Sequence, residues 1–406
     1  MNSHLSDVLI IRLTCSLAVC ATCTALLMAG CAPKARSADE QADDPPTHCK
    51  QGMNYWNVGE YIQSENEFKL ALSLDTNYAP AYAGLALTTA QTAKIAGDAE
   101  TAENGFNEAL KLADKAQSLD SKIPEGFIAK AIVITMKNEG KEATTWLDEV
   151  EKEYNKALKL DRKNAEALYR RGCCYKKAYE LSKAADDFRK VIDLKKEFAM
   201  QANEQLGLVQ KIERASSGSD VSKKIALVER IRRADIAALF VSELQIEKLI
   251  EKKAHRSDDT VFRALADSTE MRTDSIVSKA MISDIDAHWA RDFIIDIVGY
   301  GIRGLEPYPD HTFHPDQLVN RGEFAQMVED VFFAITGERR TAANQADNES
   351  RFPDVNQVHP AYDAIRAAVD NGLMDTGKNG EFGPDKPVSG PDALLVIRNL
   401  KFLWLH

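Results

Sequence analysis

Residues 282–290 read ISDIDAHWA, and the motifs that follow are GIRG at 301–304, YPDHTFHPD at 308–316 and VNRGEFAQM at 319–327. An apolar segment fills the gap between the first two motifs and predicts a helix. The glycines and prolines of the next two motifs predict a turn-rich loop. The last motif begins a second apolar helix, because an acid in the first turn favours the helix dipole.

This order of motifs resembles an S-layer homology repeat, complete over 282–337, which we call copy 2. Two weaker copies flank it. Copy 1 (224–250) keeps IRRADIAAL at 231–239 but lacks the first half of the repeat. Copy 3 (350–406) has Gly390 in the place of the motif arginine and Pro360 in the place of the tryptophan. The resemblance implies a mostly helical, pseudo-threefold bundle that binds cell-wall polysaccharide or peptidoglycan.

The polymer-binding residues expected from this resemblance are Arg321, Arg233, Trp289, Glu323 and Asp235. The planar guanidinium group of arginine binds carboxylates in a bidentate manner, which suits the acidic or pyruvylated saccharides that the family binds. Trp289 could stack on a sugar or belong to the core. The two acids could touch the polymer or only stabilise a helix start. Because copies 1 and 3 lack motif residues, we expect one or two sites, built around Arg321 and Arg233.

A second resemblance covers residues 45–213. Gly52, Tyr55 and Phe68 recur in spacing as Gly172, Tyr175 and Phe188. The pattern resembles tetratricopeptide repeats, whose helix pairs stack into an α-α superhelix. The predicted repeats are 45–78, 79–123, 124–164 and 165–198, followed by a capping helix.

The consensus of these repeats places several side chains in a concave groove that would bind a protein or peptide partner. They are Met53, Trp56, Leu87, Tyr169, Cys173, Lys176 and Lys177. For Trp56 and Tyr169, ordinary packing between helices is an equally open interpretation.

The N-terminus predicts export and lipidation. Residues 1–30 form an apolar signal peptide that ends in LMAGC at 27–31, which resembles a lipoprotein signal with Cys31 as the acylated residue. Residues 31–44 are polar and predict a flexible tether. The sorting rule known for lipoproteins of enteric bacteria then implies an outer-membrane lipoprotein that faces the periplasm. A further linker is expected at 214–223, between the repeats and the bundle (224–406).

Composition excludes several function classes. The net charge of −11 argues against nucleic-acid binding. The sequence contains neither a nucleotide-binding loop nor a catalytic signature. We therefore expect that the protein is not an enzyme and binds no cofactor. The turn that contains Asp310 lacks the ligand ladder of a calcium loop. His288, His311 and His314 lack metal-ligand spacing, so we expect no metal.

The combined expectation is a lipoprotein that tethers envelope layers, with wall polymer bound by the bundle and protein partners bound by the repeats. The alternative is a scaffold for envelope protein assembly or secretion, in which the bundle is a non-binding vestige.

Overall fold

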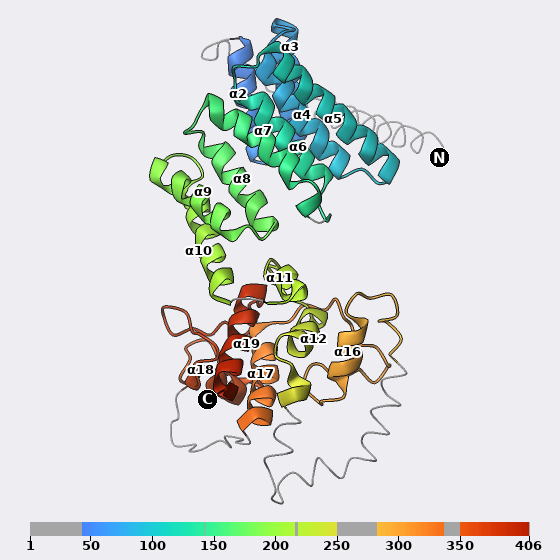
Figure 1. The fold of residues 1–406 in the computed structure, drawn as a ribbon, viewed down its shortest axis with the longest axis vertical. Coiled ribbons are helices and arrows are strands. Elements are labelled where there is room, and N and C mark those ends of the chain that lie inside the picture. Colours follow the sequence, from blue (N-terminus) through green and yellow to red (C-terminus); the bar gives the residue numbers. More distant parts are fainter. Residues whose placement is uncertain (1–42, 142, 216–217, 250–281, 337–349, 406) are drawn as a thin grey trace, which may run out of the picture. The chain divides into compact units, whose positions relative to one another are not determined.

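The computed structural model describes residues 43–405 except 142, 216–217, 250–281 and 337–349 (Figure 1). The predicted signal peptide, Cys31 and most of the tether lie outside these residues. The described part of the chain is helical, and its β-type pairings are two isolated bridges. The mainly helical fold class is therefore confirmed. Within the same residues, no helix is both long enough and apolar enough to cross a bilayer. The chain divides into two compact units between Ser121 and Lys122.

The first unit consists of two helix pairs. Their helices are α2 (Pro45–Asn57), α3 (Tyr61–Leu74), α4 (Ala79–Lys94) and α5 (Ala99–Leu119). The side chains of Asp44 and Asp98 accept hydrogen bonds from the amides of Thr47 and Thr101, which caps α2 and α5. The second predicted repeat is longer than the consensus because α5 runs for 21 residues.

The second unit begins with two more helix pairs and a closing helix. These are α6 (Glu125–Lys137), α7 (Leu147–Leu160), α8 (Ala165–Lys177), α9 (Leu181–Leu194) and α10 (Ala199–Ala215). A short 3-10 turn, η2 (Ala143–Thr145), precedes α7. Glycine allows the close approach of α8 to α9, because an added Cβ at Gly172 would lie 2.8 Å from the Phe188 ring. This small-to-aromatic packing is the one that the repeat pattern predicted.

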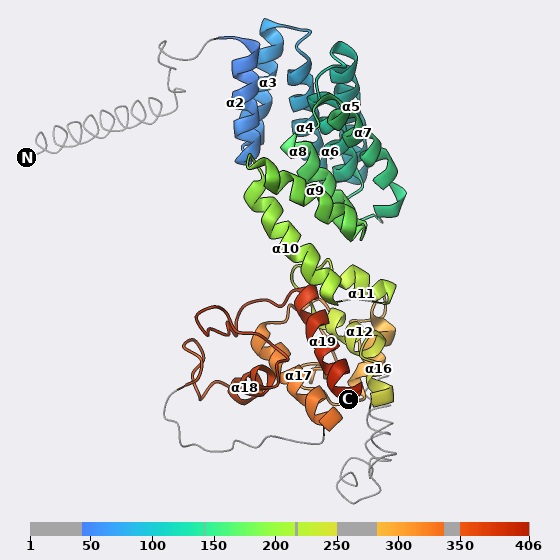
Figure 2. The ribbon, with the colours of Figure 1, turned by 60° about the vertical axis from the view of Figure 1, so that its left-hand side comes forward.

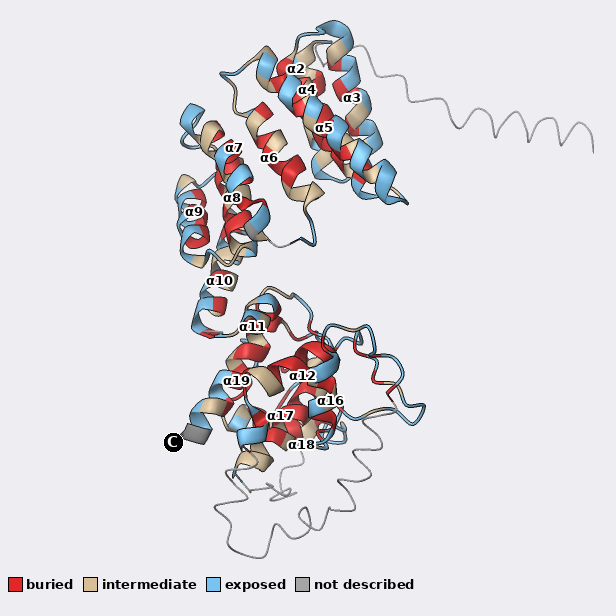
Figure 3. Ribbon diagram, turned by 45° about the vertical axis from the view of Figure 1, so that its right-hand side comes forward, coloured by how far each residue is buried: buried red, intermediate tan, exposed pale blue. Residues whose placement is uncertain are grey.

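The C-terminal bundle follows in the same unit (Figure 2). Its helices are α11 (Asp220–Ile225), α12 (Arg233–Ser242), α16 (Arg291–Val298), α17 (Arg321–Thr336), α18 (Tyr362–Asp370) and α19 (Gly390–Leu405). Between the helices run long turns, whose backbone makes hydrogen bonds both within each turn and to neighbouring loops. Buried residues gather on the helix faces that point into the bundle (Figure 3).

Helix α10 belongs to both the repeats and the bundle. Ile212 and Ala215 lie in the core cluster of the bundle, and Lys211 pairs with Asp392 of α19 at 2.8 Å. Residues 214–223 were expected to form a linker, and their described residues differ from that expectation. They include the end of α10 and most of α11, since apolar contacts from both helices enter the bundle core.

Three short segments meet at the centre of the bundle in a ring of backbone hydrogen bonds. The amide of Ile231 donates to Val388, the amide of Val388 to Val319, and the amide of Val319 to Ile231, at 2.9, 3.4 and 3.1 Å. Each segment leads directly into α12, α17 or α19. The pseudo-threefold arrangement expected from the repeat motif is therefore present, and copy 1 contributes to it although it lacks its first half.

Candidate functional site

Arg233 of copy 1 holds the loop of copy 2. Its Nε donates to the carbonyl oxygen of Phe313 and its Nη2 to that of Glu306, both at 2.9 Å, and Nη1 donates to the carbonyl oxygen of Gly304. The guanidinium lies 4.6 Å over the Phe313 ring. The residue is only 5% exposed, and this burial lowers the pKa of its side chain. The arginine expected to clamp polymer therefore uses its donors inside the protein.

Arg321 of copy 2 repeats this arrangement on copy 3. Its Nε donates to the carbonyl oxygen of Phe382 at 2.9 Å, and its Nη2 donates to that of Asp375 at 2.6 Å. Its guanidinium lies 4.5 Å over the Phe382 ring. Each motif arginine thus fastens the loop of the next copy. Glu306 and Asp375 are equivalent acceptors of Nη2, and Arg233 has an additional acceptor in the carbonyl oxygen of Gly304.

Gly390 occupies the arginine position of copy 3, where the next copy in the ring is copy 1. In place of a loop, residues 225–228 of the chain fill this junction. An added Cβ at Gly390 would lie 1.7 Å from the carbonyl oxygen of Ile225, while its amide donates to Val228 at 2.8 Å. The missing arginine therefore has a steric explanation, because residues 225–228 occupy the space where its side chain would begin.

The two motif acids hold helix starts. Asp235 accepts a hydrogen bond from the Arg232 amide at 2.8 Å, and Glu323 accepts one from the Asn320 amide at 3.0 Å. Burial raises the pKa of Asp235, against the opposing effects of this hydrogen bond and of Arg232. These contacts explain why an acid stands two residues after each arginine without any polymer.

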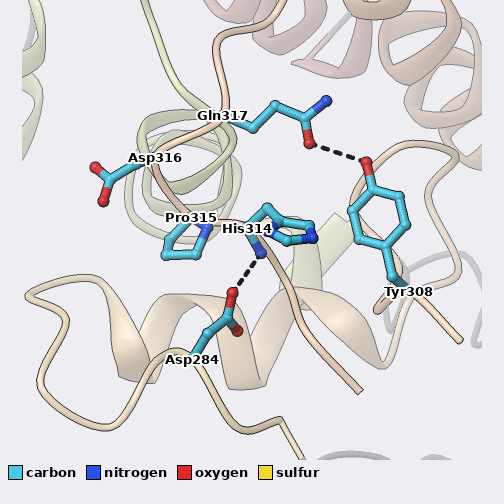
Figure 4. A pocket seen from close by; sticks show the side chains of 6 residues that line it. All are labelled: Asp284, Tyr308, His314, Pro315, Asp316 and Gln317. Atoms are coloured by element: carbon cyan, nitrogen blue, oxygen red, sulfur yellow. Dashed lines mark hydrogen bonds between the residues drawn. The ribbon is translucent and has the colours of Figure 1, made fainter. Parts of the chain in front are cut away.

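A pocket of about 680 Å³ opens in copy 2, where the arginine-held loop meets the first motif (Figure 4). We call it the copy 2 pocket; it is lined by Asp284, Tyr308, His314, Pro315, Asp316 and Gln317.

Hydrogen bonds and ring contacts give this pocket its form. The carboxylate of Asp284 accepts from the amides of Phe313 and His314 at 2.8 and 2.7 Å. The hydroxyl of Tyr308 donates to the amide oxygen of Gln317 at 2.9 Å, and its ring meets the ring of His314 edge-on at 4.9 Å. The walls of the pocket are therefore pre-formed, with an aromatic side and an acidic side.

Trp289 lies on the surface next to His288, which approaches the pocket residue Asp316. It is 55% exposed, so the interpretation of Trp289 as a core residue is wrong. Its ring lies 5.7 Å from that of His288, and His288 Nε2 is 3.9 Å from the carboxylate of Asp316. Arg232 pairs with the same carboxylate at 3.0 Å. An exposed indole next to a preformed pocket is a surface on which a sugar ring can stack.

Copy 3 has the same frame without the aromatic residues. Asp354 accepts from the amides of Phe382 and Gly383 at 2.9 and 2.6 Å, as Asp284 does in copy 2. Gly377 donates to Glu381 as Tyr308 donates to Thr312. These equivalences place Gly377, Gly383 and Pro360 where copy 2 has Tyr308, His314 and Trp289. Of these two described frames, copy 2 is therefore the one that carries rings for stacking.

The residues predicted to line a groove in the helical repeats differ in burial and in packing contacts. Leu87 is 4% exposed, so its prediction as a groove residue is wrong: the side chain is packed in the interior. Tyr169 stacks on Phe198 at 5.1 Å, and Trp56 meets Tyr61 edge-on at 5.1 Å, so both have packing contacts. The remaining members differ in exposure: Met53, Cys173 and Lys176 are half-buried and Lys177 is exposed.

A side-chain hydrogen bond joins α8 to the closing helix α10. Lys176 Nζ of α8 donates to Gln205 of α10 at 2.6 Å, and burial lowers the pKa of Lys176. Lys177 remains as a predicted partner contact on the exposed side of α8.

Among the described residues, no three His, Cys, Asp or Glu side chains gather to hold a metal ion. His288 Nδ1 accepts from the Ala290 amide at 3.2 Å, and His359 Nδ1 accepts from Ala361 in the same way at 3.1 Å. These histidines shape the start of α16 and α18.

Sequence reasoning missed most of the pocket residues. Tyr308, His314, Asp316 and Gln317 were recognised only as part of a turn motif, and Asp284 only as the motif aspartate. A signal was present, because the turn carries rings and hydroxyls that a purely structural turn does not need. Their convergence depends on Arg233, which is distant in sequence.

Comparisons with known families agree with this geometry. The model of the S-layer homology domain family matches residues 282–325 and 351–393. A tetratricopeptide repeat model matches residues 165–198, the bounds predicted for the fourth repeat. No curated protein matches the chain. The first module indicates cell-wall binding and association with the cell envelope, and the second indicates protein–protein interaction. Both are binding modules and not catalytic domains.

Solved structures with similarity to the chain include three proteins. They are the thermophilic TPR protein TTC0263 of Thermus thermophilus (15% identity, 41% of this chain, 81% of that chain, TM-score 0.36), the MamA protein (20%, 41%, 81%, 0.28) and YrrB, a TPR protein with an unusual peptide-binding site (19%, 40%, 92%, 0.21). At these TM-scores the similarities say nothing about the site. The family matches, read with the helical geometry, identify a chain that carries S-layer homology segments in copies 2 and 3 and a tetratricopeptide repeat at 165–198.

Proposed function

We propose that this protein binds a saccharide of the cell wall, in polysaccharide or peptidoglycan, at the copy 2 pocket. The observation that carries the proposal is a preformed pocket that contains Tyr308 and His314, together with the exposed Trp289, whose neighbour His288 approaches the pocket residue Asp316. Sugar rings bind to aromatic faces by their apolar C–H surface, and the nearby carboxylates and the amide of Gln317 can bond their hydroxyls.

In this proposal Arg233 and Arg321 are positioning residues. Arg233 fastens the carbonyls of Gly304 and Glu306 and so sets the place of Tyr308, which follows in the same loop. Asp235 and Glu323 act one step further away, by fixing the helices that carry the arginines. The number of binding sites is then one, because copy 3 has the arginine-held frame but no stacking rings at the equivalent positions.

The other parts of the chain extend this function. We propose that Cys31 is lipidated and anchors the protein in the outer membrane, facing the periplasm. The helical repeats hold a protein partner near Lys177. Since the lipid and the wall would be bound together, each attachment raises the effective concentration of the other, and the chain would tether envelope layers.

The test is sedimentation of the mature chain, without residues 1–31, with isolated cell walls. Trp289→Ala and Tyr308→Ala are each expected to weaken pelleting about tenfold, as truncation of an aromatic hot spot does. The matched controls are Pro360→Ala and Gly377→Ala at the equivalent places in copy 3, which should pellet as the wild type does.

The assembly scaffold with a vestigial bundle is the competing function. Copy 3 favours it, because Gly377, Gly383 and Pro360 stand where copy 2 has Tyr308, His314 and Trp289. A mature chain that stays in the supernatant at all wall concentrations would establish this alternative and rule out wall tethering. Equal losses in the copy 2 and copy 3 variants would move the binding site away from the copy 2 pocket.

A further inference from the structure

The copy 2 pocket has more carboxylates than available cations. Asp284 and Asp316 line it, and Asp310 lies in the same loop. The hydroxyl and amide of Thr312 donate to Asp310 and lower its pKa. A ligand that enters the pocket therefore meets an acidic surface.

The nearby arginines are already engaged. Arg233 is buried and gives its donors to three carbonyl oxygens. Arg232 pairs with Asp316 at 3.0 Å. Arg303, in the same loop, donates to Asp330 at 2.7 Å and to Glu329 at 2.6 Å.

Arg291, beside Trp289, also has acidic neighbours. It lies 3.7 Å from Asp286 and 3.6 Å from Asp292. Both carboxylates are more than four-fifths exposed, so they add negative charge to the side from which a polymer would approach.

We infer that the copy 2 pocket takes a saccharide unit without a free carboxylate, either neutral or amine-bearing, and disfavours acidic units. The inference rests on the proposed wall binding and differs from the acidic or pyruvylated ligand that the motif arginines implied. A carboxylate in the pocket would meet a net negative charge, because Asp284, Asp310 and Asp316 outnumber the two arginines Arg232 and Arg233. Hydroxyls or a protonated amine would instead donate to these carboxylates, and an amine would also be attracted to the aromatic faces.

The experiment compares untreated walls with walls whose carboxylates have been converted to amides, using the mature chain at low salt. The expected result is that amidated walls bind the chain at least as tightly as untreated walls. Since charges around the pocket repel acidic groups of the wall, we expect a gain of about threefold, which disappears at high salt.

Two variants separate the pocket from the overall charge of the protein. Asp316→Asn should reduce the gain on amidation, because it removes one repelling carboxylate from the pocket. Asp385→Asn makes the same change of net charge at the equivalent place in copy 3 and should leave the gain intact.

Loss of pelleting on amidated walls, by fivefold or more, would overturn the inference, since the ligand would then need its carboxylate. An equal response of the two variants would also overturn it, because the effect would come from net charge alone. Failure of the wild type to pellet with untreated walls is a different result, and it would reject the wall-binding function itself.

Discussion

The guanidinium of Arg233 lies over the ring of Phe313, at 4.6 Å, while its Nε donates to the carbonyl oxygen of the same residue at 2.9 Å. Arg321 and Phe382 form the same pair at 4.5 and 2.9 Å. A single side chain thus satisfies a buried carbonyl and packs against an apolar ring. This relationship makes the motif arginine a fastener between successive copies of the bundle.

Replacement of Arg233 should lower the stability of the folded protein. Arg233→Lys keeps the charge but cannot reach three carbonyl oxygens in one plane, so the free energy of unfolding should fall by about 3 kcal/mol. Urea unfolding followed by circular dichroism measures the change. Arg232→Ala is the control, because this neighbour is exposed and its ion pair contributes about 0.5 kcal/mol. If Arg233→Lys is as stable as the wild type but no longer binds cell walls, Arg233 contacts the wall polymer directly.

Restoration of the motif at copy 3 should be harmful. Gly390→Ala would place a Cβ 1.7 Å from the Ile225 oxygen, and relief of the overlap must shift the backbone at 225–228. We expect a loss of about 3 kcal/mol in unfolding free energy, and Gly390→Arg should be no better tolerated. The control is Gly207→Ala in α10, where an added Cβ meets nothing within 4 Å. That variant should gain up to about 1 kcal/mol, since alanine favours a helix interior. Urea unfolding measures both changes, and a neutral Gly390→Ala would show that the junction is loosely packed.

Glu243 should make the second unit sensitive to acid. Burial alone would raise the pKa of Glu243, but hydrogen bonds from Ser222, Ser219 and Lys401 lower it to about 2. Because the folded pKa is depressed, the stabilisation is complete above the unfolded value of 4.5 and is lost as the pH falls towards 2. The contribution is at most on the order of 3 kcal/mol.

Glu243→Gln should therefore flatten the dependence of unfolding free energy on pH in this acidic range. Urea titrations at several pH values measure it, with Glu247→Gln as the control on an exposed neighbour. An unaltered pH profile in Glu243→Gln would show that the carboxylate is not held in its charged form.

His48 should give the first unit the opposite pH dependence. Burial alone would lower the pKa of His48, but its hydrogen bonds to Asp43 at 2.8 Å and Glu67 at 2.7 Å raise it. The charged form therefore stabilises the fold below the unfolded value of 6.5, and this stabilisation is lost as the pH rises through the folded value.

His48→Gln should remove this loss in the pH range that begins at the unfolded value of 6.5 and extends above it. Thermal unfolding across that range measures the effect, and His311→Gln, an exposed histidine of the bundle, is the control. A wild-type protein whose first unit is equally stable at both ends of the range would contradict the prediction.

Much of the architecture was predictable because it depends on local patterns. The helix pairs of the first 215 residues follow from small and aromatic residues at regular spacing, such as Gly172 and Phe188. Copies 2 and 3 follow from motif order, and the family matches confirm both.

The site was less predictable, because its contacts join residues far apart in the chain. Arg233 stands 80 residues before Phe313 and was assigned to the polymer by analogy with its fork geometry. Trp289 was undecided between core and surface, since a tryptophan after a histidine fits either environment. The exposed position settles its burial, and its role in binding stays a prediction.

The sequence by itself determined the helical modules, their order and the positions at which a small residue must stand. Those features arise from propensities and periodicities that each segment carries alone. Only the tertiary structure decided that the arginines face the carbonyls of the next copy, that Gly390 meets Ile225, and that the acidic and aromatic side chains of copy 2 converge on one pocket. Each of these depends on how three copies close into a ring, and closure is a relation between segments that no segment encodes by itself.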